Sequence, residues 1–375
     1  MDAGKLIDAF HVEGFRLFTG VPDSLLSKLS AAVMARTDVT HVIAANEGNA
    51  VGLAIGEYLT SGNPALVYMQ NSGLGNAVNP ITSLADPAVY GIPMFLVIGW
   101  RGEPGIHDEP QHVFQGEVTP GLLNVLGIPY AIFSKEADGE KLVKELVAKM
   151  RQRSGPVALL VRKGVLEGDY PVKKKAAASE IKREEAIECL LNVLPKKAFL
   201  VATTGKTGRE LYELREKRGE AQRDFLTVGG MGHASSIALG VAKRDPSRWT
   251  VSLDGDGAIL MHMGAMAVAA SVKPKRFLHV LLNNYAHESV GGQPTTADTV
   301  SFELISKAVG YTGYKKAETL SEITAAVEEI LRSDSGLWLL EIRLQQGARA
   351  DLGRPKKTPR ENKEAVMRFL KGEAP

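Results

Sequence analysis

The chain has 375 residues, of which 44% are hydrophobic and 23% charged, a composition typical of globular proteins that excludes a disordered, collagen-like or coiled-coil chain. Its 45 basic and 43 acidic residues leave a net charge of +2, which argues against a nucleic-acid or membrane partner bound through bulk charge. The single cysteine, Cys189, allows no internal disulfide, and charged residues occupy the N-terminal stretch where a signal peptide would be apolar. We therefore expect a cytoplasmic protein.

Short, almost entirely apolar runs alternate along the chain with segments of helical spacing. Apolar runs of this length are typical of parallel strands that are covered on both faces, and their alternation with helices predicts open, doubly wound α/β sheets. We expect strands at residues 65–69, 94–98, 157–161, 198–202, 249–253, 277–282 and 337–342, and helices at residues 52–59, 141–150, 209–217, 264–271 and 320–331.

A charged stretch that is rich in small residues interrupts this alternation at residues 171–180 and predicts a linker. We expect two α/β domains, residues 1–170 and 186–375, joined by residues 171–185. Ligands of doubly wound sheets bind at the carboxyl ends of the strands. The loops that follow the predicted strands are therefore the candidates for function.

The most informative of these loops surrounds Asp256. An apolar strand ends in Gly255-Asp256-Gly257, and after residues 258–282, which are 25 residues with a helix predicted from about 258 to 271, a second strand ends in Asn283-Asn284. This spacing predicts that Asp256 and the asparagine pair lie together at the ends of neighbouring parallel strands. Carboxylate, amide and carbonyl oxygens suit Mg²⁺, and the glycines allow a phosphate to approach the backbone. A simple turn is the alternative for the first fragment alone.

This pattern resembles the diphosphate-anchoring motif of thiamin-diphosphate enzymes. The resemblance implies two cofactors, thiamin diphosphate and Mg²⁺, with Asp256, Asn284 and the carbonyl of Ala286 as metal ligands and with Gly255 and Gly257 beside the diphosphate. It also implies the fold, with a pyrimidine-type first domain and a diphosphate-type second domain. Both would be doubly wound parallel sheets.

The resemblance further implies a glutamate that activates the pyrimidine of the cofactor. Glu47 is the candidate, because it begins a predicted helix rich in small residues. An apolar setting disfavours the charge of a carboxylate and lets it share a proton with a ring nitrogen. A glutamate that merely stabilises the first turn of a helix is the alternative.

Two further loops of the second half resemble cofactor loops of the family. Residues 228–234 contain Gly230 and Met231, and the resemblance implies that the methionine side chain wedges the cofactor into a bent shape. Thr204 and Gly205 follow the strand predicted at 198–202, where the family has a loop that touches the cofactor. Gly205 does not belong to a P-loop, because Leu200 stands where that motif requires glycine.

Six segments narrow the resemblance to the phosphonopyruvate decarboxylase family and, less closely, to the sulfopyruvate decarboxylases: residues 19–26, 45–49, 69–76, 99–103, 108–112 and 283–295. The implied activity is that of a carbon–carbon lyase that converts 3-phosphonopyruvate into phosphonoacetaldehyde and CO₂. Decarboxylation of sulfopyruvate or another 2-oxo acid is the alternative, and a non-catalytic nucleotide-binding α/β protein is a third one from another class.

The same resemblance places candidate catalytic and substrate-binding residues in loops near the cofactor. Asp23 and His112 are the candidate proton donors beside Glu47, with His107 and His287 as further possibilities. A dianionic phosphonate requires donors and cations, of which arginine fits best. Ser24, Ser72, Asn76 and Arg101 are the candidates, and the sequence does not choose between Arg101 and two other loop arginines, Arg349 and Arg354. The family also implies a homo-oligomer with its active site at the subunit interface.

Overall fold

The computed structural model describes residues 1–172 and 179–373, which form two compact units. Of the described residues, unit 1 comprises 1–172 and 289–293, and unit 2 comprises 179–288 and 294–373. Within the segment that we expected to be a linker, residues 173–178 lie outside the described residues, and helix α7 (Arg183–Val193) begins before the end of that segment. The sequence did not indicate that residues 289–293 group with unit 1, where the Gln293 side chain donates a hydrogen bond to Ser30 Oγ at 2.7 Å.

Unit 1 is built on a six-stranded sheet with the order β2-β1-β3-β4-β6-β5, and every neighbouring pair is parallel. The central strands are buried along their length, except at Gln70, the last residue of β3, because helices cover both faces. The strands are β1 (Leu17–Gly20), β2 (Thr40–Ile43), β3 (Ala65–Gln70), β4 (Met94–Gly99), β5 (Tyr130–Phe133) and β6 (Val157–Val161).

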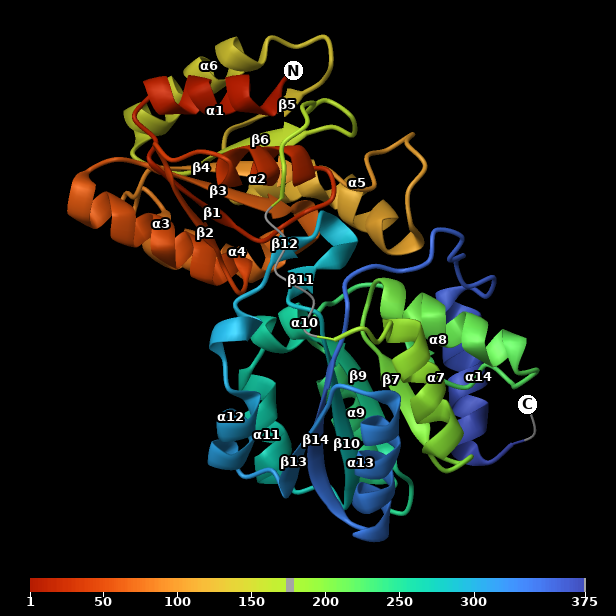
Figure 1. Ribbon diagram of the computed structural model, residues 1–375. Helices are drawn as coiled ribbons and strands as arrows, with labels where there is room; N and C mark the ends of the chain where they lie inside the picture. The colour runs from red at the N-terminus through yellow and green to blue at the C-terminus, as the bar shows by residue number, and fades with distance from the viewer. Residues whose placement is uncertain (173–178, 374–375) are drawn as a thin grey trace. The chain divides into compact units, whose positions relative to one another are not determined.

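The helices of unit 1 form two layers with one apolar core on each face of the sheet. One core is rich in phenylalanine, and the ring of Phe10 lies 4.7 Å from that of Phe95 on the sheet. In Figure 1, α1 and α6 lie on one side of the sheet and α3 and α4 on the other. The helices are α1 (Ala3–Val12), α2 (Ser27–Met34) and α6 (Gly139–Arg153) around the phenylalanine-rich core, and α3 (Glu47–Ser61), α4 (Leu74–Pro80) and α5 (Pro110–Val125) around the other, with η1 (Asn71–Gly73) and η2 (Ile81–Ala85) next to α4.

Unit 2 is built on a second six-stranded parallel sheet, with the order β13-β14-β10-β9-β7-β8. Its sheet strands are β7 (Phe199–Ala202), β8 (Phe225–Leu226), β9 (Thr250–Gly255), β10 (Arg276–Asn283), β13 (Gly313–Ala317) and β14 (Gly336–Arg343). Its helices are α7, α8 (Lys206–Lys217), α9 (Ala234–Arg244), α10 (Asp256–Met261), α11 (Gly264–Val272), α12 (Phe302–Val309), α13 (Leu320–Arg332) and α14 (Pro359–Lys371), with the short segments β11 (Ala286–His287) and η4 (Ala297–Thr299). The short segments η3 (Glu288–Val290) and β12 (Gln293–Pro294) lie at the two ends of the stretch 289–293 that groups with unit 1.

The predicted pair of doubly wound parallel sheets is confirmed, and the differences from the sequence analysis have physical causes. The strands that were not predicted are short, and most of them lie at sheet edges, where polar residues such as Lys315 and Lys316 of β13 replace the apolar run. The helix expected from about 258 to 271 is two helices, α10 and α11, because the backbone leaves helical geometry at His262.

The strand order of each sheet fixes where a ligand can bind. The chain reverses its direction of progress across the sheet between β1 and β3 in unit 1, and between β7 and β9 in unit 2. At such switch points the loops after the two strands diverge and leave a crevice for ligands at the carboxyl edge. Residues 21–26 and 71–76 follow β1 and β3, and residues 203–205 and 255–257 lie at the ends of β7 and β9.

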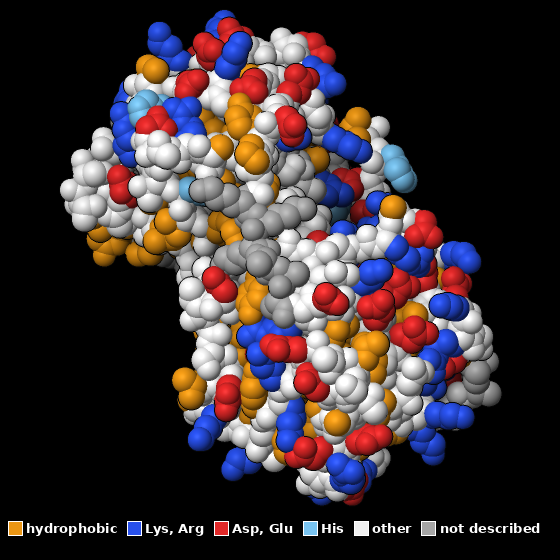
Figure 2. All heavy atoms as spheres, in the orientation of Figure 1, with side chains coloured by type: hydrophobic (Ala, Val, Ile, Leu, Met, Phe, Trp, Pro, Cys, Tyr) orange, Lys and Arg blue, Asp and Glu red, His pale blue; other side chains and the backbone are white. Residues whose placement is uncertain are grey.

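The described surface matches the balanced composition of the chain. On the face drawn in Figure 2, acidic and basic side chains are intermixed over both units. None of the helices in residues 1–172 and 179–373 combines the length and the apolar character that a membrane crossing requires.

Candidate active site

Asp256 lies at the edge of the unit 2 sheet, where the sequence spacing placed it. Strands β9 and β10 are parallel neighbours with Gly255 opposite Leu282, so Asp256 and Asn284 follow adjacent strand ends. Asp256 is the first residue of α10 and is only 2% exposed, and its Oδ2 accepts a hydrogen bond from the Thr295 hydroxyl.

The environment of Asp256 suits a bound cation. Burial raises its pKa to about 6, against the opposing effect of hydrogen bonds from the Thr295 side chain and from the backbone N–H groups of Asp256, Gly257 and Asn284. Among the described residues no basic side chain forms an ion pair with Asp256, so all of its hydrogen-bond donors are neutral. A buried carboxylate without a counter-ion is costly, and a divalent cation beside it would remove that cost.

The two asparagines at the end of β10 have different roles. Asn283 is fully buried, and its amide donates to Glu341 Oε1 at 2.7 Å, so it belongs to the interior. Asn284 instead directs its amide nitrogen to Glu288 Oε2 at 2.7 Å, while its Oδ1 accepts from the Ala286 N–H at 3.1 Å. These contacts favour Asn284 over Asn283 as the ligand of a cation.

The turn that carries Ala286 is held in an unusual conformation. Tyr285 has φ +57°, a left-handed geometry that costs a bulky residue free energy. Its carbonyl accepts from Thr295 N at 3.1 Å, and the Arg343 guanidinium lies 4.8 Å from the centre of its ring. This strained backbone turns the Ala286 peptide back toward Asn284. Asp256, Asn284 and the Ala286 carbonyl could together hold a metal, and Asp256 is the single carboxylate among them.

The glycine-containing loops of unit 2 lie near the same sheet edge. Gly205, directly before α8, has φ +98°, a conformation that residues with a side chain rarely adopt. Met231 is half-buried in the loop between β8 and α9. A Cβ on the neighbouring Gly232 would lie 2.8 Å from the Ala258 carbonyl, so this loop passes directly beside α10.

His287, one of the candidate histidines, faces the start of α10. A Cβ on Gly257 would lie 3.0 Å from His287 Cε1, so only glycine fits at position 257 without displacing the imidazole. Burial lowers the pKa of His287 to about 4, which keeps the ring neutral at physiological pH.

In unit 1, Glu47 begins α3 as predicted, and its side chain is buried at 5% exposure. Burial raises the pKa of Glu47, while a 2.8 Å hydrogen bond from Asn76 Nδ2 to Oε2 opposes that rise. A Cβ on Gly73 would lie 2.1 Å from Glu47 Oε1, so the loop after β3 leaves space for this carboxylate only because residue 73 is glycine. We expected Asn76 among the substrate ligands, and in the structure its side chain contacts Glu47.

The other candidates of unit 1 form one polar cluster at the ends of β1 and β4. Asp23 is fully buried, its Oδ2 accepts from the N–H groups of Leu25 and Leu26, and its Oδ1 has no partner. Burial raises the pKa of Asp23 to about 6, although the nearby positive charge of Arg101 and the backbone donors oppose the rise. The group can therefore exchange a proton near neutral pH.

Arg101 connects this cluster, and it is already paired. Its Nε and Nη2 bind Asp108, while Nη1 donates to Ser24 Oγ at 2.9 Å. Asp108 also lies 3.0 Å from His112 Nδ1, and although burial opposes its ionisation, Arg101 and His112 hold the pKa of Asp108 well below its usual range. Burial lowers the pKa of His112, and the Asp108 carboxylate opposes that shift.

The structure separates some candidates from these clusters. Ser72 is exposed and accepts from Gln70 Nε2 at 2.6 Å, and His107 is exposed. Arg349 forms ion pairs with Glu184, Glu213 and Asp351. The sequence analysis assigned no role to four residues that contact the candidate site, although all of them lie inside segments that it singled out: Gly73, Asp108, Glu288 and Thr295.

The buried Asp23 carboxyl gives a prediction about stability. Because its pKa is raised from 3.8 to about 6 in the folded chain, its favourable contribution is complete below pH 3.8 and is lost as the pH rises through 6. We therefore expect the change that Asp23→Asn causes in the free energy of unfolding to be more stabilising at pH 8 than at pH 4, by up to about 3 kcal/mol. Urea unfolding of both proteins at the two pH values measures this difference. The exposed Asp169→Asn serves as the control, and a pH-independent effect of Asp23→Asn would contradict the prediction.

Comparison with known proteins agrees with this geometry. Two family models match the chain, the N-terminal TPP binding domain of thiamine pyrophosphate enzymes at residues 3–123 and the C-terminal TPP binding domain at residues 204–342. Phosphonopyruvate decarboxylase of Streptomyces hygroscopicus is 35% identical over 93% of this chain and 88% of its own length, and that of Streptomyces viridochromogenes is 34% identical over 96% and 92%. Sulfopyruvate decarboxylase of Methanosarcina acetivorans is 27% identical over 86% of each chain. The chain belongs to the thiamine pyrophosphate (thiamin diphosphate) enzyme family, in which it is a homologue of the phosphonopyruvate decarboxylases.

Proposed function

We propose that the chain catalyses the thiamin-diphosphate- and Mg²⁺-dependent decarboxylation of 3-phosphonopyruvate to phosphonoacetaldehyde and CO₂. At the coarser level it is a thiamin-diphosphate-dependent 2-oxo acid decarboxylase, a carbon–carbon lyase. Two nearly full-length relatives of 34–35% identity support phosphonopyruvate as the substrate over sulfopyruvate, whose decarboxylase is 27% identical. The observation that carries the proposal is the buried Asp256 carboxylate, which forms no ion pair with the described residues and accepts a hydrogen bond from the backbone N–H of Asn284.

The residues of unit 2 fit the diphosphate and its metal. Asp256, Asn284 and the Ala286 carbonyl would hold Mg²⁺, which prefers such oxygen ligands and shares them with phosphate oxygens. The remaining cofactor contacts would come from Thr204, Gly205, Gly230, Met231, Gly255 and Gly257. When bound, the cofactor supplies the electron sink that stabilises the carbanion left by CO₂.

Glu47 would act on the pyrimidine of the cofactor. Burial favours its neutral form, so the carboxyl can hold a proton and share it with a ring nitrogen. Asn76 opposes this effect by donating to the charged form, so the two residues together set the protonation of Glu47. Gly73 leaves room for the carboxylate at this position, since a side chain at residue 73 would collide with it.

The polar cluster around Asp23 would bind the substrate and deliver a proton to it. The unpartnered Oδ1 of Asp23 is the group best suited to deliver a proton, and His112, oriented through Nδ1 by Asp108, is the second candidate. Arg101 and Ser24 would meet the phosphonate. The Nη1 of Arg101 contacts the neutral Ser24 hydroxyl and not a carboxylate. An anion can therefore bind at this edge of the guanidinium, while Asp108 holds the opposite edge.

We further propose a homo-oligomer in which the active site is completed between subunits, as the family implies. A separated subunit would then lack part of the cofactor site.

A substrate panel tests the proposal directly. With Mg²⁺ and thiamin diphosphate, we expect aldehyde release from 3-phosphonopyruvate with a kcat/KM at least tenfold above that for sulfopyruvate and for pyruvate. A dianionic phosphonate forms stronger charge-assisted hydrogen bonds with Arg101 and Ser24 than a sulfonate monoanion does. Preferential turnover of sulfopyruvate would instead establish the alternative substrate.

Glu47 and Asp256 should separate catalysis from cofactor binding. Glu47→Gln keeps the shape of the side chain but cannot exchange a proton, so we expect retained thiamin-diphosphate affinity in calorimetry and a loss of activity of at least 100-fold. Asp256→Ala should lose both properties, because the metal loses its carboxylate ligand. Near-normal turnover by Glu47→Gln would refute the assigned role.

The narrow space beside Glu47 yields a prediction about position 73. Gly73→Ala would place a methyl group 2.1 Å from Glu47 Oε1 and force the carboxylate to move. We expect activity to fall at least tenfold while the thermal unfolding temperature changes little, since the carboxylate can shift without exposing the core. Gly121→Ala in α5, where an added Cβ meets nothing within 4 Å, is the matched control. Equal activity of the two variants would show that Glu47 is not confined there.

A further inference from the structure

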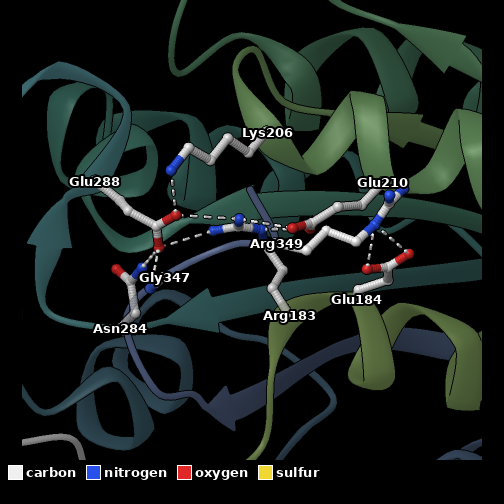
Figure 3. Close-up of polar contacts among 8 residues, drawn as sticks. All are labelled: Arg183, Glu184, Lys206, Glu210, Asn284, Glu288, Gly347 and Arg349. Carbon is white, nitrogen blue, oxygen red and sulfur yellow. Dashed lines mark hydrogen bonds and ion pairs between the residues drawn. The ribbon is translucent and has the colours of Figure 1, made fainter. Parts of the chain in front are cut away.

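Glu288 has no role in the chemistry proposed above, yet it contacts a residue of the candidate metal site. Its carboxylate lies four positions after Asn284 and is 12% exposed. Figure 3 shows the Glu288 carboxylate in contact with four residues: Asn284, Arg183, Lys206 and the backbone of Gly347.

Every contact of Glu288 with these four residues comes from an N–H donor. Oε2 accepts from Asn284 Nδ2 at 2.7 Å, from Gly347 N at 3.1 Å and from Arg183 Nη1 at 3.2 Å. Oε1 accepts from Lys206 Nζ at 3.0 Å and from Arg183 Nη2 at 3.3 Å. Both oxygens therefore act as acceptors, and a neighbouring amide can meet them only with its nitrogen.

This arrangement fixes the orientation of the Asn284 amide. If the amide were rotated by 180°, its oxygen would face Glu288 Oε2 across the present 2.7 Å contact, which is repulsive because neither atom carries a hydrogen. The Ala286 N–H, which donates to Asn284 Oδ1, selects the same orientation. The oxygen is thereby kept on the side of the amide away from Glu288.

Glu288 is itself held from several elements. Arg183 of α7 is bound by both oxygens of Glu210 in α8, at 2.6 and 2.9 Å, which fixes the guanidinium against Glu288. Lys206 lies at the start of α8, and Gly347 follows β14. In the same loop the Gln346 amide donates to the Asn284 carbonyl at 3.2 Å, so side chain and backbone of Asn284 are both restrained.

We propose that Glu288 is a positioning residue that fixes the amide of Asn284 with its oxygen presented to Mg²⁺. This inference rests on the proposed metal site and adds to it a residue that contacts neither metal nor cofactor. The hydrogen-bond partners of metal ligands commonly change metal affinity by 10–100-fold when they are replaced.

The first test measures Mg²⁺ affinity in the presence of thiamin diphosphate by calorimetry. Glu288→Gln can offer either an oxygen or an NH₂ group to Asn284, so the amide loses its fixed orientation and we expect at least about tenfold weaker Mg²⁺ binding. Glu288→Asp retains the negative charge for Arg183 and Lys206 but is too short to reach Asn284, and should weaken binding similarly if Glu288→Gln does not fold. Glu184→Gln removes the same charge beside Arg349 without touching Asn284, and should bind Mg²⁺ as the wild type does.

The second test reverses the polarity of the contact. Asn284→Asp places a carboxylate against Glu288, and the repulsion between the two side chains should turn the new carboxylate away from the orientation in which the amide is held. In this background Glu288→Gln supplies an NH₂ donor, so the double variant should bind Mg²⁺ more tightly than Asn284→Asp alone. The same substitution at 288 would thus lower affinity beside asparagine and raise it beside aspartate. A role limited to local folding would produce losses in both backgrounds.

The results separate this inference from the proposed function. Wild-type Mg²⁺ affinity in both Glu288 variants, or losses that simply add in the double variant, would overturn the positioning role while leaving the cofactor site intact. A wild-type protein that shows no Mg²⁺-dependent binding of thiamin diphosphate would overturn both. Weakened binding with the reversal of sign supports both.

Discussion

The buried Asp256 carboxylate is the constraint on which the candidate site depends. It is 2% exposed and surrounded by neutral donors, and it can remain there at acceptable free energy because four hydrogen bonds offset part of its desolvation. Two adjacent parallel strands bring those donors together, since β9 ends at Gly255 and β10 ends at Asn283. The sheet therefore provides the scaffold, and the residues just beyond its edge provide the groups that we propose hold the diphosphate and its metal.

The acids of unit 1 are governed by the same balance between burial and hydrogen bonding. Asp23 and Glu47 are both buried and both have raised pKa values, but neighbouring donors limit the rise. Asp108 shows the opposite outcome, because Arg101 and His112 hold its pKa well below the usual range although it is partly buried. Burial and hydrogen-bond partners thus shift the pKa values of carboxyl groups at the edge of one sheet in opposite directions.

Support for the site extends beyond the residues that would contact the cofactor. The strained backbone at Tyr285 is kept by Thr295 and Arg343, and the Asn284 amide is kept by Glu288, which Arg183 and Glu210 hold in turn. These contacts join the first helix of unit 2, the start of α8 and the loop after β14. A ligand site made of one carboxylate, one amide and one carbonyl needs such restraint, because each group must keep its oxygen directed at the same point.

Local patterns in the sequence determined the two doubly wound sheets, the position of Glu47 at a helix start and the pairing of Asp256 with Asn284, because hydrophobic periodicity and the length of a βαβ unit are properties of the chain itself. Tertiary structure alone decided that Asn76 binds Glu47, that Asp108 forms an ion pair with Arg101, and that Glu288 orients Asn284. It also decided the edge strands such as β13, whose polar residues show no apolar run. These contacts depend on which loops the strand order brings to one edge of a sheet, and that order is set by packing between segments far apart in sequence.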